Sequence, residues 1–149
     1  EFLPVQSESS FDKYVLHGKQ TTFSQTGNPL VEMYWDHGLI DGTKVVLRHG
    51  KPILKVPYVN GERHGIEREW DDDGNVIAEI RWENDVRHGS SRFFDNEDTI
   101  IEWYYNGKAV SLREYHMMEN RDQMVAELYG EKESLNEQMK ERQTNRIIE

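Results

Sequence analysis

Three histidines recur at a regular interval and are the first candidates for chemistry. His17, His64 and His88 each precede a glycine, and Asp41 holds the corresponding place in the second copy of the pattern. Imidazoles are common ligands of Zn²⁺, which holds them at about 2.1 Å. Equivalent positions in successive hairpins of an open sheet lie about 10 Å apart, which is too far for one shared ion. We therefore expect no metal site and interpret the histidines as turn residues.

A run of acidic residues invites a second metal hypothesis. Residues 71–75 read Asp-Asp-Asp-Gly-Asn, which is similar to the start of a calcium-binding loop. That loop needs a glutamate at its twelfth position, and Trp82 stands there instead. The run is therefore predicted to form an acidic hairpin turn.

Carboxylates on neighbouring strands are the remaining candidates for catalysis. Glu67, Glu69, Glu79 and Glu102 would have to form an acid/base pair in a cleft that raises the pKa of one of them. Glutamates on a polar sheet face are usually solvated. The sequence also contains no nucleophile elbow, phosphate loop, zinc-ligand pair or dinucleotide fingerprint. We expect no enzyme and no cofactor.

The elements that carry these residues follow a repeat. Gly18, Gly42, Gly65 and Gly89 succeed one another at steps of 24, 23 and 24 residues, a period typical of repeat architectures. Each copy contains two strand-like segments with a large residue near the end of each. Those residues are Phe23, Leu47, Trp70 and Phe94 in the first segments, and Trp35, Tyr58, Trp82 and Tyr105 in the second. The pattern predicts a mainly β fold, a single-layer antiparallel meander of repeated β-hairpins with a C-terminal α-helix.

Turn residues separate the predicted strands. Glycine, asparagine and aspartate reach positive φ at the least cost. They occur between the two strands of a copy and again after the second strand, at Gly27, Gly50 and Gly74, and at Gly38, Gly61, Asp85 and Gly107. Pro52 and Pro57 fall in one strand and each removes a backbone donor, so we expect that strand to be bulged or only partly paired.

Alternation along the strands predicts two unlike faces. Val76, Ala78, Ile80 and Trp82 would share an apolar, aromatic face, and the intervening residues would form a polar, acidic one. We predict that the polar face binds a protein partner. Its predicted contact residues are Glu32, Tyr34, Glu67, Glu69, Glu79, Arg81, Glu102 and Tyr104.

The composition changes after the repeats. Val110–Tyr115 reads as a closing strand, and a helix is predicted from Met117 onward because strong helix formers dominate there. An apolar stripe runs along this helix, and Gly130 predicts a break or kink in it. The stripe comprises Met117, Met124, Leu128, Leu135 and Met139. Two interpretations stay open. Either the first half packs on the last hairpin and caps the sheet, or residues 117–149 self-associate or bind a partner through the second half of the helix.

These observations divide the chain into a flexible lead-in (1–13), a hairpin-repeat sheet (14–116) and a helical segment (117–149). The chain carries 28 acidic and 18 basic residues, for a net charge of −10. That charge disfavours nucleic acid and anionic membranes and favours a basic protein partner. Because no apolar run approaches the roughly 20 residues of a membrane span, we expect a soluble protein and favour the cytoplasm.

The repeat units resemble MORN-type repeats, specifically the bacterial variant found in antitoxin-like proteins. The resemblance rests on residues 58–65, on Trp70 with Asp73-Gly74-Asn75, and on residues 82–89, and it covers about residues 17–108. It implies an elongated, twisted antiparallel sheet that makes protein–protein contacts, in some cases to neutralise a toxin or to assist assembly. The chain departs from the pattern at Asp41, Asp85 and residues 96–98, which leaves the last hairpin's turn undefined.

Overall fold

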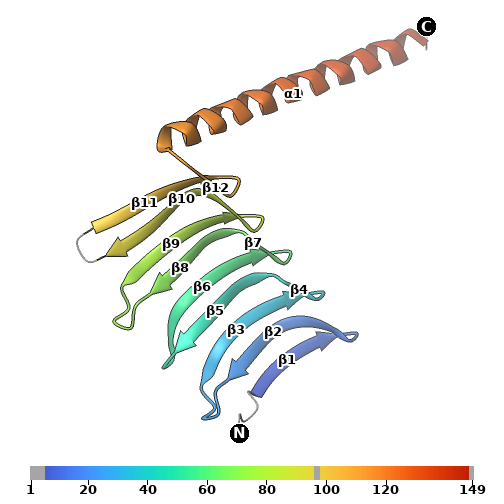
Figure 1. The fold of residues 1–149 in the computed structure, drawn as a ribbon. Helices are drawn as coiled ribbons and strands as arrows, with labels where there is room; N and C mark the ends of the chain where they lie inside the picture. Colours follow the sequence, from blue (N-terminus) through green and yellow to red (C-terminus); the bar gives the residue numbers. More distant parts are fainter. Residues whose placement is uncertain (1–5, 96–97, 148–149) are drawn as a thin grey trace. The chain divides into compact units, whose positions relative to one another are not determined.

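Twelve strands in one sheet and one helix make up the described chain (Figure 1). The structure is a computed structural model that describes residues 6–95 and 98–147. The strands are β1 (Gln6–Asp12), β2 (Val15–Phe23), β3 (Pro29–Asp36), β4 (Leu39–Ile40), β5 (Gly42–Arg48), β6 (Lys51–Val59), β7 (Glu62–Arg63), β8 (Gly65–Trp70), β9 (Val76–Glu83), β10 (Val86–Asp95), β11 (Asp98–Tyr105) and β12 (Lys108–Val110). The helix is α1 (Leu112–Ile147).

The strands pair in chain order and always antiparallel. The sheet order is β1-β2-β3-β5-β6-β8-β9-β10-β11-β12, and the two short strands β4 and β7 pair with the ends of β3 and β6. Figure 1 shows the successive hairpins side by side from the blue end of the sheet to the yellow end. The predicted fold class is confirmed: a mainly β chain, with a single open antiparallel sheet of hairpins and a C-terminal helix.

Tight turns of one type close the hairpins along one side of the sheet. His37-Gly38, Asn60-Gly61, Asn84-Asp85 and Asn106-Gly107 each place both residues at positive φ. Two consecutive positive φ angles define the type I′ turn, whose twist matches that of the flanking strands. The positive φ at Gly27, Gly50 and Gly74 confirms the predicted glycine turns on the opposite side.

The sheet begins earlier in the chain than we expected. β1 (Gln6–Asp12) pairs with β2, although the sequence predicts a flexible lead-in there. The connecting turn places Lys13 and Tyr14 at positive φ. Neither residue type signals such a turn, which is why the sequence pattern hides this hairpin.

The glycines of the recurring motif do not form turns. Gly18 lies inside β2, Gly89 lies inside β10, and Gly42 and Gly65 begin β5 and β8, all four at positive φ. The interpretation of the neighbouring histidines as turn residues is therefore wrong. The motif marks a kink where the strand changes direction, and glycine is the residue that adopts this backbone without a steric penalty.

The predicted bulge in β6 is present, but proline is not its general cause. The pairing shifts between Val46 and Leu47, which leaves Ile53 as the extra residue on β6. Equivalent shifts leave Leu30 extra on β3, beside Pro29, and Ile77 extra on β9, which contains no proline. β6 is nevertheless paired with β5 from Lys51 to Tyr58. The bulge belongs to the repeat rather than to Pro52.

The helix begins earlier than expected and runs unbroken through Gly130, so two predictions are wrong. Ser111 and Glu114 form a capping box: the Ser111 amide donates to Glu114 Oε2 at 2.8 Å, and the Glu114 amide donates to Ser111 Oγ at 3.2 Å. This cap turns residues 112–115 into helix instead of a closing strand. A single glycine costs a helix only about 1 kcal/mol, and the strong helix formers around Gly130 outweigh it.

The sheet and the helix are two separate compact units, divided between Val110 and Ser111. Whether the helix caps the sheet stays a prediction. Among the described residues, no helix is long and apolar enough to cross a membrane. Within the sheet, the buried apolar side chains are those of Val56, Ala78, Ile80 and Tyr105.

Candidate functional site

Register pairing assigns every strand position to one of two faces. Directly paired residues share a face, and alternation along each strand extends the assignment. We call the face of Ala78, Ile80 and Trp82 the Trp82 face. The opposite face, which carries Arg68, Glu79 and Arg92, is the Glu79 face.

The predicted contact residues divide between the two faces. Glu67 pairs with Ile80, and Glu69 pairs with Ala78, so both lie on the Trp82 face, as do Glu102 and Tyr104. The remaining predicted residues lie on the Glu79 face: Glu32, Tyr34, Glu79 and Arg81. The expectation of one acidic face opposite one aromatic face is therefore wrong, because alternation within a strand does not say how neighbouring strands align.

The Trp82 face carries a ladder of large side chains across the repeats. The register pairs Trp35 with Ile40, Tyr58 with Arg63, and Trp82 with Arg87. The fourth aromatic of the ladder is Tyr104, which pairs with Gly89, and not Tyr105 as the spacing had predicted. The aromatic of the first repeat thus has an aliphatic partner, and those of the second and third repeats have arginines.

Trp82 lies between those two arginines. The Arg63 guanidinium stacks 3.6 Å from the centroid of the Trp82 ring, and the Arg87 guanidinium lies 5.7 Å from it. Arg87 also donates to the Tyr104 hydroxyl at 3.1 Å, and that hydroxyl donates to Glu102 at 2.8 Å. Stacked guanidinium and indole groups form a rigid, amphipathic surface of the kind that is enriched where proteins bind each other.

A carboxylate under Trp82 completes this cluster. The Trp82 indole N–H donates to Glu67 Oε2 at 2.9 Å. Burial raises the pKa of Glu67, and the charge of Glu69 adds to that rise, while the Trp82 hydrogen bond and the two arginines lower it. In the first repeat an amide takes the same place, where Trp35 donates to Gln20 Oε1 at 3.0 Å. The third repeat therefore has a carboxylate, Glu67, at the position where the first repeat has the neutral amide of Gln20.

Both predicted acidic contact residues on the Glu79 face, Glu79 and Glu32, are already paired with cations. Glu79 accepts a hydrogen bond from Arg68 at 2.8 Å and lies 3.6 Å from Arg92. Glu32 lies 2.7 Å from Lys19 Nζ, and this hydrogen bond raises the pKa of Lys19. The charges of Glu79 and Glu32 are therefore compensated within the sheet, and these two carboxylates have little left to offer a partner.

The three acidic residues on the Trp82 face differ in this respect. Glu67 and Glu102 accept only from neutral donors, the indole of Trp82 and the hydroxyl of Tyr104. Within the described part of the chain, neither they nor Glu69 forms an ion pair with lysine or arginine. The Trp82 face therefore presents carboxylates without an ion-pair partner beside half-buried aromatic and guanidinium groups.

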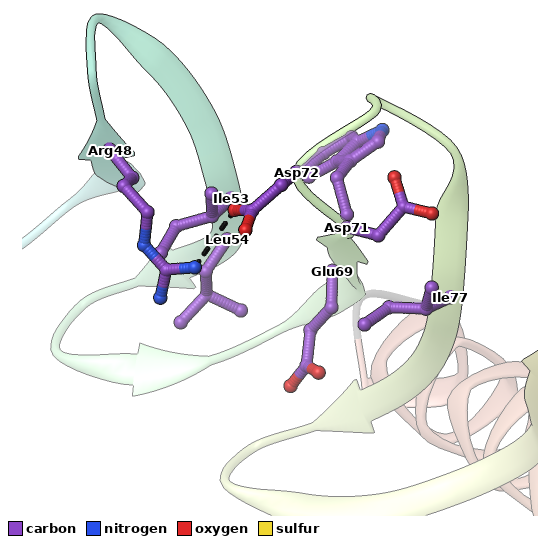
Figure 2. A pocket seen from close by; sticks show the side chains of 8 residues that line it. Arg48, Ile53, Leu54, Glu69, Asp71, Asp72 and Ile77 are labelled. Carbon is purple, nitrogen blue, oxygen red and sulfur yellow. Dashed lines mark hydrogen bonds and ion pairs between the residues drawn. The ribbon is translucent and has the colours of Figure 1, made fainter.

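Glu69 also borders a groove between two hairpin tips. Figure 2 shows side chains from β6 and from the ends of β8 and β9 around this groove, which encloses about 460 Å³. Its lining residues are Arg48, Ile53, Leu54, Glu69, Trp70, Asp71, Asp72 and Ile77. The dashed line in Figure 2 marks the ion pair of Arg48 with Asp72, 2.9 Å long and exposed to solvent. Apolar walls with carboxylates at one end suit a lysine or arginine side chain.

The acidic run at the edge of this groove forms the predicted hairpin turn. The Gly74 amide donates to the Asp71 carbonyl at 3.2 Å, and the Asn75 amide donates to Asp71 Oδ1 at 2.8 Å. Hydrogen bonds from Asn75, the side chain first, hold the pKa of Asp71 below its usual value. Its carboxylate is thus used to hold the turn.

The motif residues tie each type I′ turn to the neighbouring strand. His64 Nδ1 lies 3.3 Å from Asn84 Oδ1, and His88 Nδ1 lies 3.2 Å from Asn106 Oδ1. Asp41 does the same through its carboxylate, which accepts from the Asn60 amide at 3.0 Å. These residues therefore have a structural role in three of the repeats. The first repeat differs, because His17 faces a second histidine.

Comparison with known families finds a similarity in two parts of the sheet. A family model described as a MORN repeat variant matches residues 16–37 and 63–84. The matched stretches are the first and third hairpin units, which contain the Gln20–Trp35 and Glu67–Trp82 pairs. No curated protein and no solved structure shows a significant match to the chain.

Proposed function

We propose that this chain, which carries repeats of the MORN variant, is a non-catalytic protein-binding module whose Trp82 face holds a basic segment of a partner protein. MORN repeats indicate a protein-interaction module in general terms. The proposal that the partner segment is basic is supported by Glu67, Glu69 and Glu102, which have no ion-pair partner among the described residues. Two of these, Glu67 and Glu69, are close enough for one charge to raise the pKa of the other, so a partner cation would relieve that repulsion.

The surroundings of these carboxylates favour a protein partner over a free ion. The Trp82 ring and its two arginines supply a stacking surface beside the charges. The groove next to Glu69 supplies apolar contacts for the stem of a lysine or arginine side chain. A basic, aromatic-containing segment would satisfy both. An inhibitory or immunity role against a basic protein is a narrower version of this proposal.

The test compares two charge-neutralised variants of the same net charge. One carries Glu67→Gln, Glu69→Gln and Glu102→Gln; the control carries Glu8→Gln, Asp12→Asn and Glu131→Gln, which are exposed positions outside the cluster and the groove. Proteins captured from the source organism's lysate by the unmodified chain are quantified by mass spectrometry. We expect the first variant to retain about tenfold less of the specific partner and the control to retain it fully.

Equal retention by both variants would contradict the assignment of the Trp82 face. Equal loss in both would show that only the net charge matters. The assay needs no knowledge of the partner in advance, because the unmodified chain defines which captured proteins are specific.

A second candidate function is self-association through α1. Met117, Met124 and Leu128 lie on one side of the helix and are 62%, 63% and 64% exposed. We expect Met124→Glu with Leu128→Glu to shift an oligomer to a monomer in light scattering. Gln123→Glu with Ala126→Glu adds the same charge on other sides of the helix and should leave the mass unchanged. A full-length chain that is already monomeric would exclude this candidate.

A further inference from the structure

The first repeat brings three metal-ligating side chains together. His17, Asp36 and His37 each offer one ligand atom, and these atoms all lie within 4.8 Å of one another. Asp36 Oδ1 lies 3.2 Å from His17 Nδ1 and 2.6 Å from His37 Nδ1. The two imidazole rings meet edge to face, with their centroids 5.3 Å apart. Sequence reasoning missed this group because it compared histidines between repeats and not across one hairpin.

The hairpin fixes the positions of all three residues. His17 lies in β2 immediately before Gly18, which pairs with Trp35 on β3. Asp36 is the last residue of β3, and His37 is the first residue of the type I′ turn, with φ of 46°. The hydrogen bond from the Gly38 amide to the Leu16 carbonyl, 2.9 Å long, holds that turn against β2. The ligand atoms are therefore presented by ordered backbone.

The second histidine is specific to this repeat. The corresponding turn position is Asn60, Asn84 or Asn106 in the other repeats. Asparagine is the residue that type I′ turns prefer at this position, so histidine at residue 37 is not explained by turn formation. Its effect is to place a second imidazole beside His17 and a carboxylate. The third repeat has His64 and Glu83 but only the Asn84 amide, which is a poor ligand for a transition metal.

We propose that His17, Asp36 and His37 bind one divalent transition-metal ion of the Zn²⁺ class. Two imidazoles and a carboxylate are a preferred donor set for this class of ion. Tetrahedral Zn²⁺ separates its ligand atoms by about 3.3 Å, which is close to the His17–Asp36 spacing of 3.2 Å. On binding, the 2.6 Å between His37 and Asp36 lengthens to this value, and the two imidazole ligand atoms, within 4.8 Å of each other, adopt it as well. Each imidazole carries its proton on Nε2 when Nδ1 binds the ion. Water or a partner side chain takes the fourth position, because all three ligands are exposed.

The test is calorimetric titration of the tag-free chain with ZnCl₂. We expect one equivalent to bind, and His37→Asn and His17→Asn to weaken binding at least about tenfold. His37→Asn introduces the residue that the other repeats use in the same turn, so the fold should persist by circular dichroism. His49→Asn is the matched control, since His49 also begins a turn with positive φ, at 51°. It should bind Zn²⁺ as tightly as the unmodified chain does.

Three results would overturn the proposal: no saturable binding by the unmodified chain, unchanged affinity in His37→Asn, or equal loss in His49→Asn. The repeat offers an independent converse experiment. Asn84→His should give the third repeat, with His64 and Glu83, the same donor set and raise the stoichiometry from one to two. Unchanged stoichiometry would contradict the argument that a histidine at this turn position, opposite a motif histidine, is what builds the site.

Discussion

The two faces of the sheet carry similar residue types but use them differently. On the Glu79 face, Glu79 lies between Arg68 and Arg92, and Glu32 is paired with Lys19. On the Trp82 face, arginines stack on aromatic rings instead, as Arg63 does on Trp82. The carboxylates of that face are left with neutral hydrogen-bond donors. The carboxylates of Glu79 and Glu32 are thus ion-paired within the sheet, whereas Glu67, Glu69 and Glu102 have no ion-pair partner among the described residues and are available to a partner protein.

The difference arises from where each arginine is directed. Arg68 and Glu79 are paired directly across β8 and β9, so their charges meet. Arg63 instead extends over Trp82, and its own ion pair is with Asp85 in the turn, 2.7 Å away, which lowers the pKa of Asp85. The arginines of the Trp82 face therefore stabilise the ladder and the turns and lower the pKa of Glu67, but they form no ion pair with Glu67 or Glu69.

The largest expected effect is on stability, from removal of Trp82. Trp82→Ala deletes the ring that Arg63 and Arg87 contact and leaves half-buried Glu67 without its indole donor. We expect a loss of about 2–4 kcal/mol in the free energy of unfolding. Arg81→Ala, the exposed neighbour on the Glu79 face, should cost under about 0.5 kcal/mol. Urea denaturation followed by circular dichroism measures both, and equal losses would mean that the ladder does not hold the sheet.

Charge reversal gives a smaller effect that separates the two faces directly. Glu79→Lys removes the partner of Arg68 and Arg92 and places a third cation beside them, so we expect a loss of about 1 kcal/mol. Glu69→Lys has no such neighbours and should change stability by less than about 0.5 kcal/mol. The loss at residue 79 should shrink in 1 M NaCl because salt screens the repulsion. Equal losses of stability at residues 79 and 69 would show that the carboxylates of the two faces do not differ in ion pairing.

The period and the turn residues allowed the fold class to be predicted from the sequence. Glycine and asparagine at fixed offsets determine where the hairpins reverse, and Gly38, Gly61 and Gly107 behave as expected. The ends of the sheet could not be predicted in the same way. The Lys13-Tyr14 turn uses residues without a turn preference, and the capping box of Ser111 and Glu114 was present in the sequence but was not recognised.

The candidate site was only partly predictable for a different reason. Alternation identifies which residues of one strand share a face, but the relation between strands depends on kinks and bulges. Positive-φ glycines such as Gly89 and extra residues such as Ile77 change which residues of neighbouring strands lie opposite each other. Glu67 and Glu102 were therefore grouped with Glu79, although the register places them on the opposite face.

The smallest predicted effect concerns the ionisation of Glu67. Burial raises the pKa of this carboxyl in the folded chain, so its charged form lowers stability. That cost is absent below the unfolded pKa of about 4.3 and is fully present above the raised folded pKa. Glu67→Gln removes the charge and keeps an oxygen for the Trp82 indole, as Gln20 does for Trp35. We expect its melting temperature to exceed that of the unmodified chain by about 1–3 °C more at pH 7 than at pH 3.5.

Gln20→Glu, the reciprocal change under Trp35, should show the opposite dependence on pH. A Glu67→Gln difference that stays constant between the two pH values would show that the Trp82 face does not hold a strained charge, and the contrast between the two faces would then rest on ion pairing alone.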